Sequence, residues 1–281
     1  MIVRPSVHWL RMLFVWRGSI LPVILPQLIT ITLLAIFIYH IHGSILSWKV
    51  SLNFVPFSLI GLTLAIFLGF RNSTSYSRFW EARTLWGVLL VESRHLVGQA
   101  LTLGAGKQQS LELAKRLCAF VYAFKHQLRG TDPRPELAVF VSPAEVERIA
   151  NAHFPASVGL LAVQEWIGEQ VRQGALNPVL VPALESAMAR MGNAVGGCER
   201  ISSTPIPFTY SVILHRCVYI YCFLLPFGLL DTIGPMTPVI VCFLAYTFLR
   251  WKPWAPSWST RLACLPTIWR WAACATRSNR R

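Results

Sequence analysis

The fold is decided by residues 56–87, which read PFSLIGLTLAIFLGFRNSTSYSRFWEARTLWG. The first part of this stretch, residues 56–70, is apolar and uncharged, and it completes a run of 21 uncharged residues between Lys49 and Arg71. A helix needs about 20 apolar residues to cross the hydrocarbon core of a bilayer, which is about 30 Å thick. The pattern therefore predicts a transmembrane helix that ends close to Arg71.

Similar runs lie on both sides of this segment. Upstream, the 31 residues between Arg17 and Lys49 contain no Asp, Glu, Lys or Arg. This run is too long, and begins too late, for a cleavable signal peptide. Downstream, residues 201–249 are apolar except near Arg216 and Asp231, and the pair Gly234-Pro235 predicts a turn between two helices. We expect four transmembrane helices, and no strand alternation or internal repeat contradicts an all-α membrane protein.

The composition excludes an ordinary soluble protein. Of the 281 residues, 54% are hydrophobic and only 14% are charged, whereas soluble domains carry roughly 25% charged residues. The net charge of +14 could indicate nucleic-acid binding, but basic residues also mark the cytoplasmic side of membrane proteins. Here they flank every predicted span on one side: Arg4, Arg11, Arg17, Arg71, Arg78, Arg83, Arg216, Arg250 and Lys252. We therefore expect both termini in the cytoplasm, contact with lipid and no nucleic-acid partner.

The chain divides into five predicted parts. These are a cytosolic N-terminal segment (1–19), transmembrane helices 1 and 2 (20–70), a helical cytosolic region (71–200), transmembrane helices 3 and 4 (201–249) and a basic, Trp-rich tail (250–281). In the cytosolic region, apolar residues at Leu117, Phe120, Val121 and Phe124 form a one-sided helical stripe. The order Ser142-Pro-Ala-Glu predicts a helix start there, with cap, proline and acid.

No enzyme motif is present. The sequence lacks a P-loop, a dinucleotide-binding glycine motif, a zinc-protease motif and a nucleophile elbow. The seven cysteines form no C-x-x-C pair, and His40 and His42 are more typical of a membrane interface than of a metal site. We predict a non-enzymatic protein without a metal or cofactor.

Two stripes run along the second predicted span. Leu62, Ile66 and Phe70 recur at every fourth residue, and Gly61, Ala65 and Gly69 form a small-residue stripe beside them. Small residues allow close helix packing in a membrane, so the simpler interpretation is that both stripes only pack against neighbouring helices in a bundle. The alternative is a ring of such helices in which Leu62, Ile66 and Phe70 form a narrow apolar pore neck, a gate that closes by dewetting.

Small polar residues follow this stripe immediately. Asn72, Ser73 and Ser75 would line a polar vestibule below the neck, interleaved with aromatic and basic residues. An interfacial belt of aromatic and basic side chains is the simpler interpretation of the same pattern.

Residues 56–87 resemble the second helix of the bestrophins, especially of their bacterial branch. Further resemblances lie in RPSVHWLRMLF at residues 4–14, in KHQLRGTDP from Lys125 and in GGCERISSTPIPFTYSVILHR from Gly196. The resemblance covers roughly residues 1–250. It implies a homopentameric channel with four membrane segments per subunit, a long helical cytosolic region and a single pore on the five-fold axis. Resemblance to the bacterial branch further implies a location in the bacterial inner membrane.

The same resemblance assigns roles to residues. It places the three apolar neck residues at Leu62, Ile66 and Phe70, and a lower cytosolic constriction at Val179 or Leu180. It implies passive conduction of small monovalent ions, with chloride or another anion as the family default. A channel for monovalent cations, as in some bacterial relatives, and a non-conducting membrane scaffold are the alternatives.

The tail departs from the family. Residues 250–281 contain seven Arg and Lys, no acid and five of the eleven Trp, so without them the net charge falls from +14 to +7. One hypothesis is a shift of reading frame near codon 250, which the DNA sequence tests. A basic tail lying on anionic lipid is the alternative.

Overall fold

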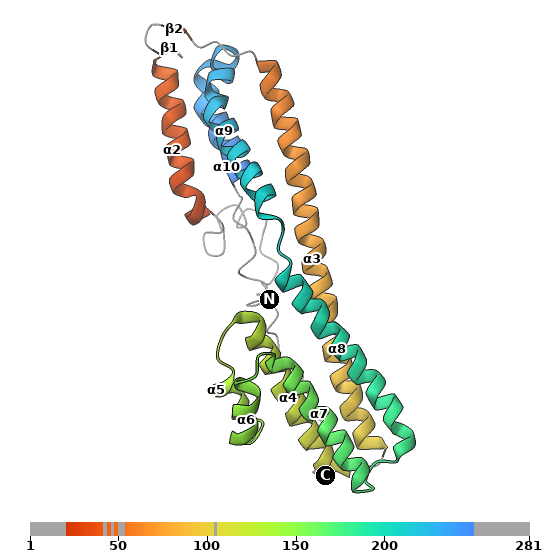
Figure 1. The fold of residues 1–281 in the computed structure, drawn as a ribbon. Helices are drawn as coiled ribbons and strands as arrows, with labels where there is room; N and C mark the ends of the chain where they lie inside the picture. The colour runs from red at the N-terminus through yellow and green to blue at the C-terminus, as the bar shows by residue number, and fades with distance from the viewer. Residues whose placement is uncertain (1–20, 42–43, 46–47, 50–53, 104–105, 250–281) are drawn as a thin grey trace, which may run out of the picture. The chain divides into compact units, whose positions relative to one another are not determined.

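The computed structural model describes residues 21–41, 44–45, 48–49, 54–103 and 106–249. Within these residues the fold is helical (Figure 1), apart from two short antiparallel strands, β1 (Ser44–Ile45) and β2 (Trp48–Lys49). The N-terminal segment 1–19 and the tail 250–281, both predicted from the sequence, lie outside the described residues.

The helices follow one another along the chain as α2 (Leu21–His40), α3 (Phe54–Thr102), α4 (Gly106–Arg129), α5 (Arg134–Leu137), α6 (Pro143–Ala150), α7 (Pro155–Arg172), α8 (Val181–Ser203), α9 (Phe208–Ile233) and α10 (Thr237–Leu249). Two short 3₁₀ turns, η1 (Pro178–Leu180) and η2 (Gly234–Met236), precede α8 and α10. The predicted helix start is confirmed, because the Ser142 hydroxyl accepts a hydrogen bond from the Glu145 backbone N–H. Gly234, with φ of +58°, ends α9 in the turn that the sequence predicts.

The chain forms two compact units. One comprises residues 77–205, and the other combines the described residues up to Tyr76 with residues 206–249. Helix α3 contributes to both, because it continues without interruption past Arg71, where the uncharged run of the sequence ends. We call the two parts the helical unit (77–205) and the membrane unit.

Three stretches of the described chain are long and apolar enough to cross a membrane: Leu21–His40, Val55–Thr102 and Phe208–Leu249. The third contains both α9 and α10, with the η2 turn between them. These stretches and the apolar composition make this a membrane protein.

The core of the membrane unit lies mainly between α2, α9 and α10, which run side by side (Figure 1), and Phe57 and Leu64 of α3 also belong to it. Ala35 of α2 and Ala245 of α10 are completely buried. Because lipid tails are as apolar as leucine, such helices associate through close packing, and small side chains permit it.

The core of the helical unit forms around α4. The predicted stripe is confirmed, since Leu117, Phe120, Val121 and Phe124 are all at most 1% exposed. The ring of Trp86 from α3 stacks on Phe124 with centroids 5.4 Å apart. Burying each such phenylalanine stabilises the fold by about 1.5–3 kcal/mol, so this stripe fixes α4 against α3, α7 and α8.

Candidate functional site

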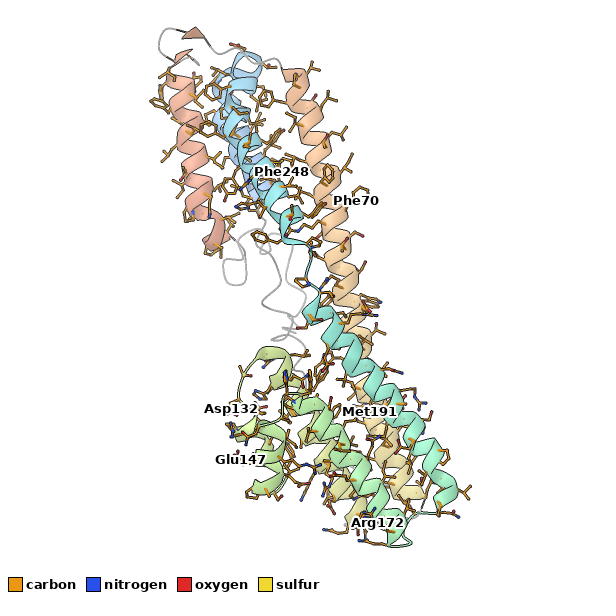
Figure 2. The ribbon with its side chains drawn as sticks, viewed as in Figure 1. Phe70, Asp132, Glu147, Arg172, Met191 and Phe248 are labelled. Atoms are coloured by element: carbon orange, nitrogen blue, oxygen red, sulfur yellow. The ribbon has the colours of Figure 1, made fainter. Side chains whose placement is uncertain are left out.

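The predicted neck residues lie on the exposed face of α3. The side chains of Leu62, Ile66 and Phe70 are 60%, 50% and 66% exposed, although all three are large and apolar. Figure 2 shows Phe70 on the side of α3 that faces away from α9 and α10. At a rise of 1.5 Å per residue, the three side chains cover about 12 Å of the helix.

The opposite face of α3 packs into the membrane unit. Phe57, Leu64 and Arg71 are 6%, 4% and 5% exposed, and they follow one another at seven-residue intervals. At about 100° per residue, the middle of this buried face lies about 160° from Ile66. A single uncharged stripe is therefore left open along one side of the helix.

The small-residue stripe does not pack as one surface. A Cβ atom added to Gly61 would meet the side chain of Tyr221 on α9, whereas one added to Gly69 would meet nothing within 4 Å. Ala65, between them, is exposed. Each step of four residues turns the stripe by about 40°, so it begins on the packed face and ends on the open one.

The predicted vestibule residues begin two residues beyond Phe70 on the same helix. Asn72 and Ser73 are exposed and Ser75 is half-buried. The neighbouring Thr74 donates from its hydroxyl to the Phe70 carbonyl at 3.0 Å. Ser73 continues the open face, about 20° around the axis from Ile66, whereas Ser75 lies about 180° from Ile66, on the packed side of the helix.

The predicted lower constriction lies in the helical unit, at the η1 turn before α8. Val179 is 81% exposed, and its backbone N–H donates to the side-chain oxygen of Asn177 at 3.0 Å. Leu180 is half-buried. No other described part of the helical unit covers the Val179 side chain, so it is free to contact another surface.

Several basic side chains beyond the stripe are engaged within the helical unit. The Arg78 guanidinium donates to the carbonyls of Ile201 and Thr204, both at 2.6 Å, at the C-terminal end of α8. Arg200 pairs with Glu81 at 2.5 Å. Unpaired carbonyls at a helix end favour a cation, so Arg78 holds α8 to α3 at this point.

The described part of the chain contains no cluster of side chains suited to binding a metal ion. No group of three or more His, Cys, Asp or Glu there could hold a metal ion. The thiols of Cys118 and Cys198 are buried and free, and burial raises the pKa of Cys118 to about 11 and that of Cys198 to about 12. A protonated, buried thiol is a poor nucleophile and a poor metal ligand.

The sequence profile of the family described as Bacterial/Fungal Bestrophin protein matches residues 1–252. The chain belongs to this bestrophin family. Among curated relatives of this bestrophin, the voltage-dependent anion channel-forming protein RSc3414 of Ralstonia nicotianae is 44% identical over 252 residues, which cover 89% of this chain and 82% of the relative. The voltage-dependent anion channel-forming protein YneE of Escherichia coli K12 is 38% identical over 249 residues, with the same two coverages.

Solved structures agree with the assignment. A variant of a bacterial bestrophin homolog from Klebsiella pneumoniae superimposes with a TM-score of 0.79 at 36% identity, covering 93% of this chain and 97% of that one. A second variant of the Klebsiella homolog gives a TM-score of 0.77 at 37% identity, covering 85% of this chain and 89% of that one. This bestrophin therefore shares both the sequence and the fold of the family.

Two features of the site were not expected from the sequence. Arg71 was expected only as a basic flank of the second span, yet it is buried on the packed face of α3. The heptad spacing with Phe57 and Leu64 is visible in the sequence and could have indicated this. The contacts of Gly61 with Tyr221 and of Gly228 with Phe57 had no such signal, because they join residues distant along the chain.

Proposed function

We propose that this chain is the pore-forming subunit of an anion channel in the bacterial inner membrane. In this proposal five copies surround one axis, each with four transmembrane helices and both termini in the cytoplasm. The pore conducts small monovalent anions passively and uses no metal or cofactor. Family membership supports the class, since the curated relatives are named as anion channel-forming proteins.

The observation that carries the proposal is the exposed apolar stripe of α3. Leu62, Ile66 and Phe70 stand directly opposite the face that packs into the membrane unit. In the proposed assembly they form the neck, and a narrow uncharged constriction of this kind controls water and ion entry by dewetting. Asn72, Ser73 and Ser75 would then line the vestibule, with Val179 and Leu180 at a lower constriction.

Charge supports an anion as the conducted species. The neck itself carries no charge and cannot select an ion by sign. The described membrane unit contains Lys49, Arg71 and Arg216 but only one acid, Asp231. Arg71 lies on the packed face of α3, so in the proposed pore these basic groups act at a distance: their summed field raises the local concentration of anions.

Purified protein in planar bilayers tests the proposal. We expect single-channel currents in the wild type, and a conductance increase of about threefold or more when Leu62, Ile66 and Phe70 are all changed to Ala, because the dewetting barrier is removed. The matched control is the triple change of Ile29, Leu33 and Phe37 to Ala. These residues have the same four-residue spacing on α2 and are 49%, 60% and 61% exposed.

The outcomes separate the alternatives. An equal increase in the α2 control would show that the α3 stripe is not the neck. Reversal potentials in asymmetric NaCl should move toward the chloride equilibrium potential, and a shift toward that of sodium would contradict anion conduction. A folded oligomer without any current would favour a membrane scaffold.

A further inference from the structure

Helices α3 and α9 meet through two reciprocal contacts between an aromatic ring and a glycine. A Cβ atom added to Gly61 of α3 would lie 2.7 Å from the Tyr221 hydroxyl oxygen of α9. In return, a Cβ atom added to Gly228 of α9 would lie 2.7 Å from Cδ2 of Phe57 on α3. Both distances are far below the 3.5–4.0 Å of an ordinary contact between non-bonded atoms, so each ring occupies the space that a side chain on the glycine would need.

We call Phe57, Gly61, Tyr221 and Gly228 the aromatic–glycine latch. Phe57 and Gly61 are four residues apart on α3, and Tyr221 and Gly228 are seven apart on α9, so each pair occupies one helix face. The contacts run in opposite directions along the two helices, since the residue number rises on α3 as it falls on α9. The latch therefore fixes both the register and the separation of an antiparallel helix pair.

The Tyr221 ring cannot swing away from Gly61 freely. Tyr221 is only 8% exposed. Its ring lies edge-on to Phe248 of α10, with centroids 5.5 Å apart, and the Phe57 ring lies 6.5 Å away on another side. In a close-packed interior such a ring yields by tenths of an ångström, and beyond that the helices themselves must move.

The latch lies on the side of α3 opposite the exposed stripe. Around the helix axis Gly61 lies about 180° from Phe70, about 140° from Ile66 and about 100° from Leu62. A displacement of α3 away from α9 at Gly61 therefore carries Phe70 and Ile66 outward, close to the direction in which they project, while Leu62 moves mainly sideways. The separation set by the tip of Tyr221 is transmitted directly to the stripe.

We propose that Tyr221 and Gly61 are positioning residues that set the width of the pore neck. The inference rests on the proposed function, in which the exposed stripe of α3 is the neck. The Tyr221 hydroxyl acts as a spacer: it holds α3 at a fixed distance from α9, and through that distance it determines how far the neck side chains reach toward the pore axis.

Three variants in planar bilayers test this role. Gly61→Ala introduces the methyl group that meets the hydroxyl, pushes α3 away from α9, and is expected to lower single-channel conductance by about threefold or more because a narrower apolar neck dewets more readily. Tyr221→Phe removes the hydroxyl and is expected to raise conductance. The double variant should restore the current of the Gly61→Ala channel, since the added methyl would then face the ring carbon Cζ at 3.4 Å.

The control is Gly87→Ala, which makes the same change on the same helix where nothing lies within 4 Å of the added Cβ. Its conductance should equal that of the wild type. The melting temperature of each variant in detergent is measured as well. If Gly61→Ala only disturbs packing, its melting temperature should fall and the double variant should not regain the current.

Several results would overturn the inference. One is a Gly61→Ala channel with wild-type conductance, and another is a double variant that stays as impaired as Gly61→Ala. If Gly61→Ala does not assemble, Tyr221→Phe decides alone, and an unchanged or reduced current contradicts the spacer role. A wild-type protein without current refutes the proposed function instead, so the two failures are distinguishable.

Discussion

The ion pair between the buried Lys125 and the half-buried Glu136 in the helical unit leads to a prediction about stability. The Lys125 ammonium donates to the Glu136 carboxylate, which also lies 3.1 Å from Nε2 of His126. The Lys125 side chain is 8% exposed, while that of Glu136 is 40% exposed. The two side chains therefore differ strongly in solvent exposure. Removing Lys125 and removing Glu136 should change the free energy of unfolding by different amounts.

Glu136→Gln leaves a buried ammonium without its counter-charge. Breaking a fully buried pair in this way costs about 3–5 kcal/mol, but water reaches the exposed part of Glu136 and screens the interaction, so we expect about 1–2 kcal/mol. Lys125→Met leaves a carboxylate that water can solvate and fills the buried space with an apolar chain of similar length. Its cost should be at most about 1 kcal/mol, because the carboxylate that remains is exposed.

Thermal unfolding of the detergent-solubilised protein measures both variants. A loss of about 1 kcal/mol lowers the melting temperature by about 2–4 °C in a protein of this size. The matched control is Glu165→Gln. Its partner is Arg148, the two side chains are 45% and 44% exposed, and an exposed pair contributes at most about 1 kcal/mol. Equal losses in Glu136→Gln and Lys125→Met, or a larger loss in the latter, would refute the reasoning.

The pH dependence of this pair has a definite sign. Burial by itself raises the pKa of Glu136, but hydrogen bonds from Lys125 and His126 outweigh it and hold that pKa below its usual range. A carboxyl with a lowered pKa in the folded state stabilises the fold above its unfolded-state pKa, and this contribution is lost as the pH falls through the folded-state pKa. The stability gap between the wild type and Glu136→Gln should therefore be full at neutral pH and close below about pH 4.

Two further predictions concern the helical unit. Gly159→Ala should destabilise it by about 1–3 kcal/mol, because the added Cβ would lie 3.0 Å from the backbone Cα of Phe120; a melting temperature equal to that of the wild type would contradict this close crossing of α7 and α4. Cys118 should resist maleimide at pH 8 in the native protein and react after denaturation, because burial raises the pKa of its thiol to about 11. Mass spectrometry of the peptide that contains it measures the difference, and rapid native labelling would exclude the buried thiol.

Local patterns in the sequence predicted much of this fold. The apolar stripe of Leu117, Phe120, Val121 and Phe124 becomes the buried face of α4, and Ser142 caps α6 as its neighbours indicate. These predictions succeed because helical periodicity and capping depend on residues within one or two turns. The family resemblance in residues 56–87 is likewise confirmed by the family match over residues 1–252.

The sequence by itself determined that α3 carries an uncharged apolar stripe at Leu62, Ile66 and Phe70, because spacing along a helix fixes which side chains share a face. Only the tertiary structure decided which face is covered. Gly61 lies under Tyr221 while Gly69 stays open, a difference that depends on where α9, some 150 residues later in the chain, crosses α3. The spacing of residues along α3 determines which side chains share a face. Whether that face is buried depends on a second helix, and the local sequence of α3 does not reveal where that helix packs.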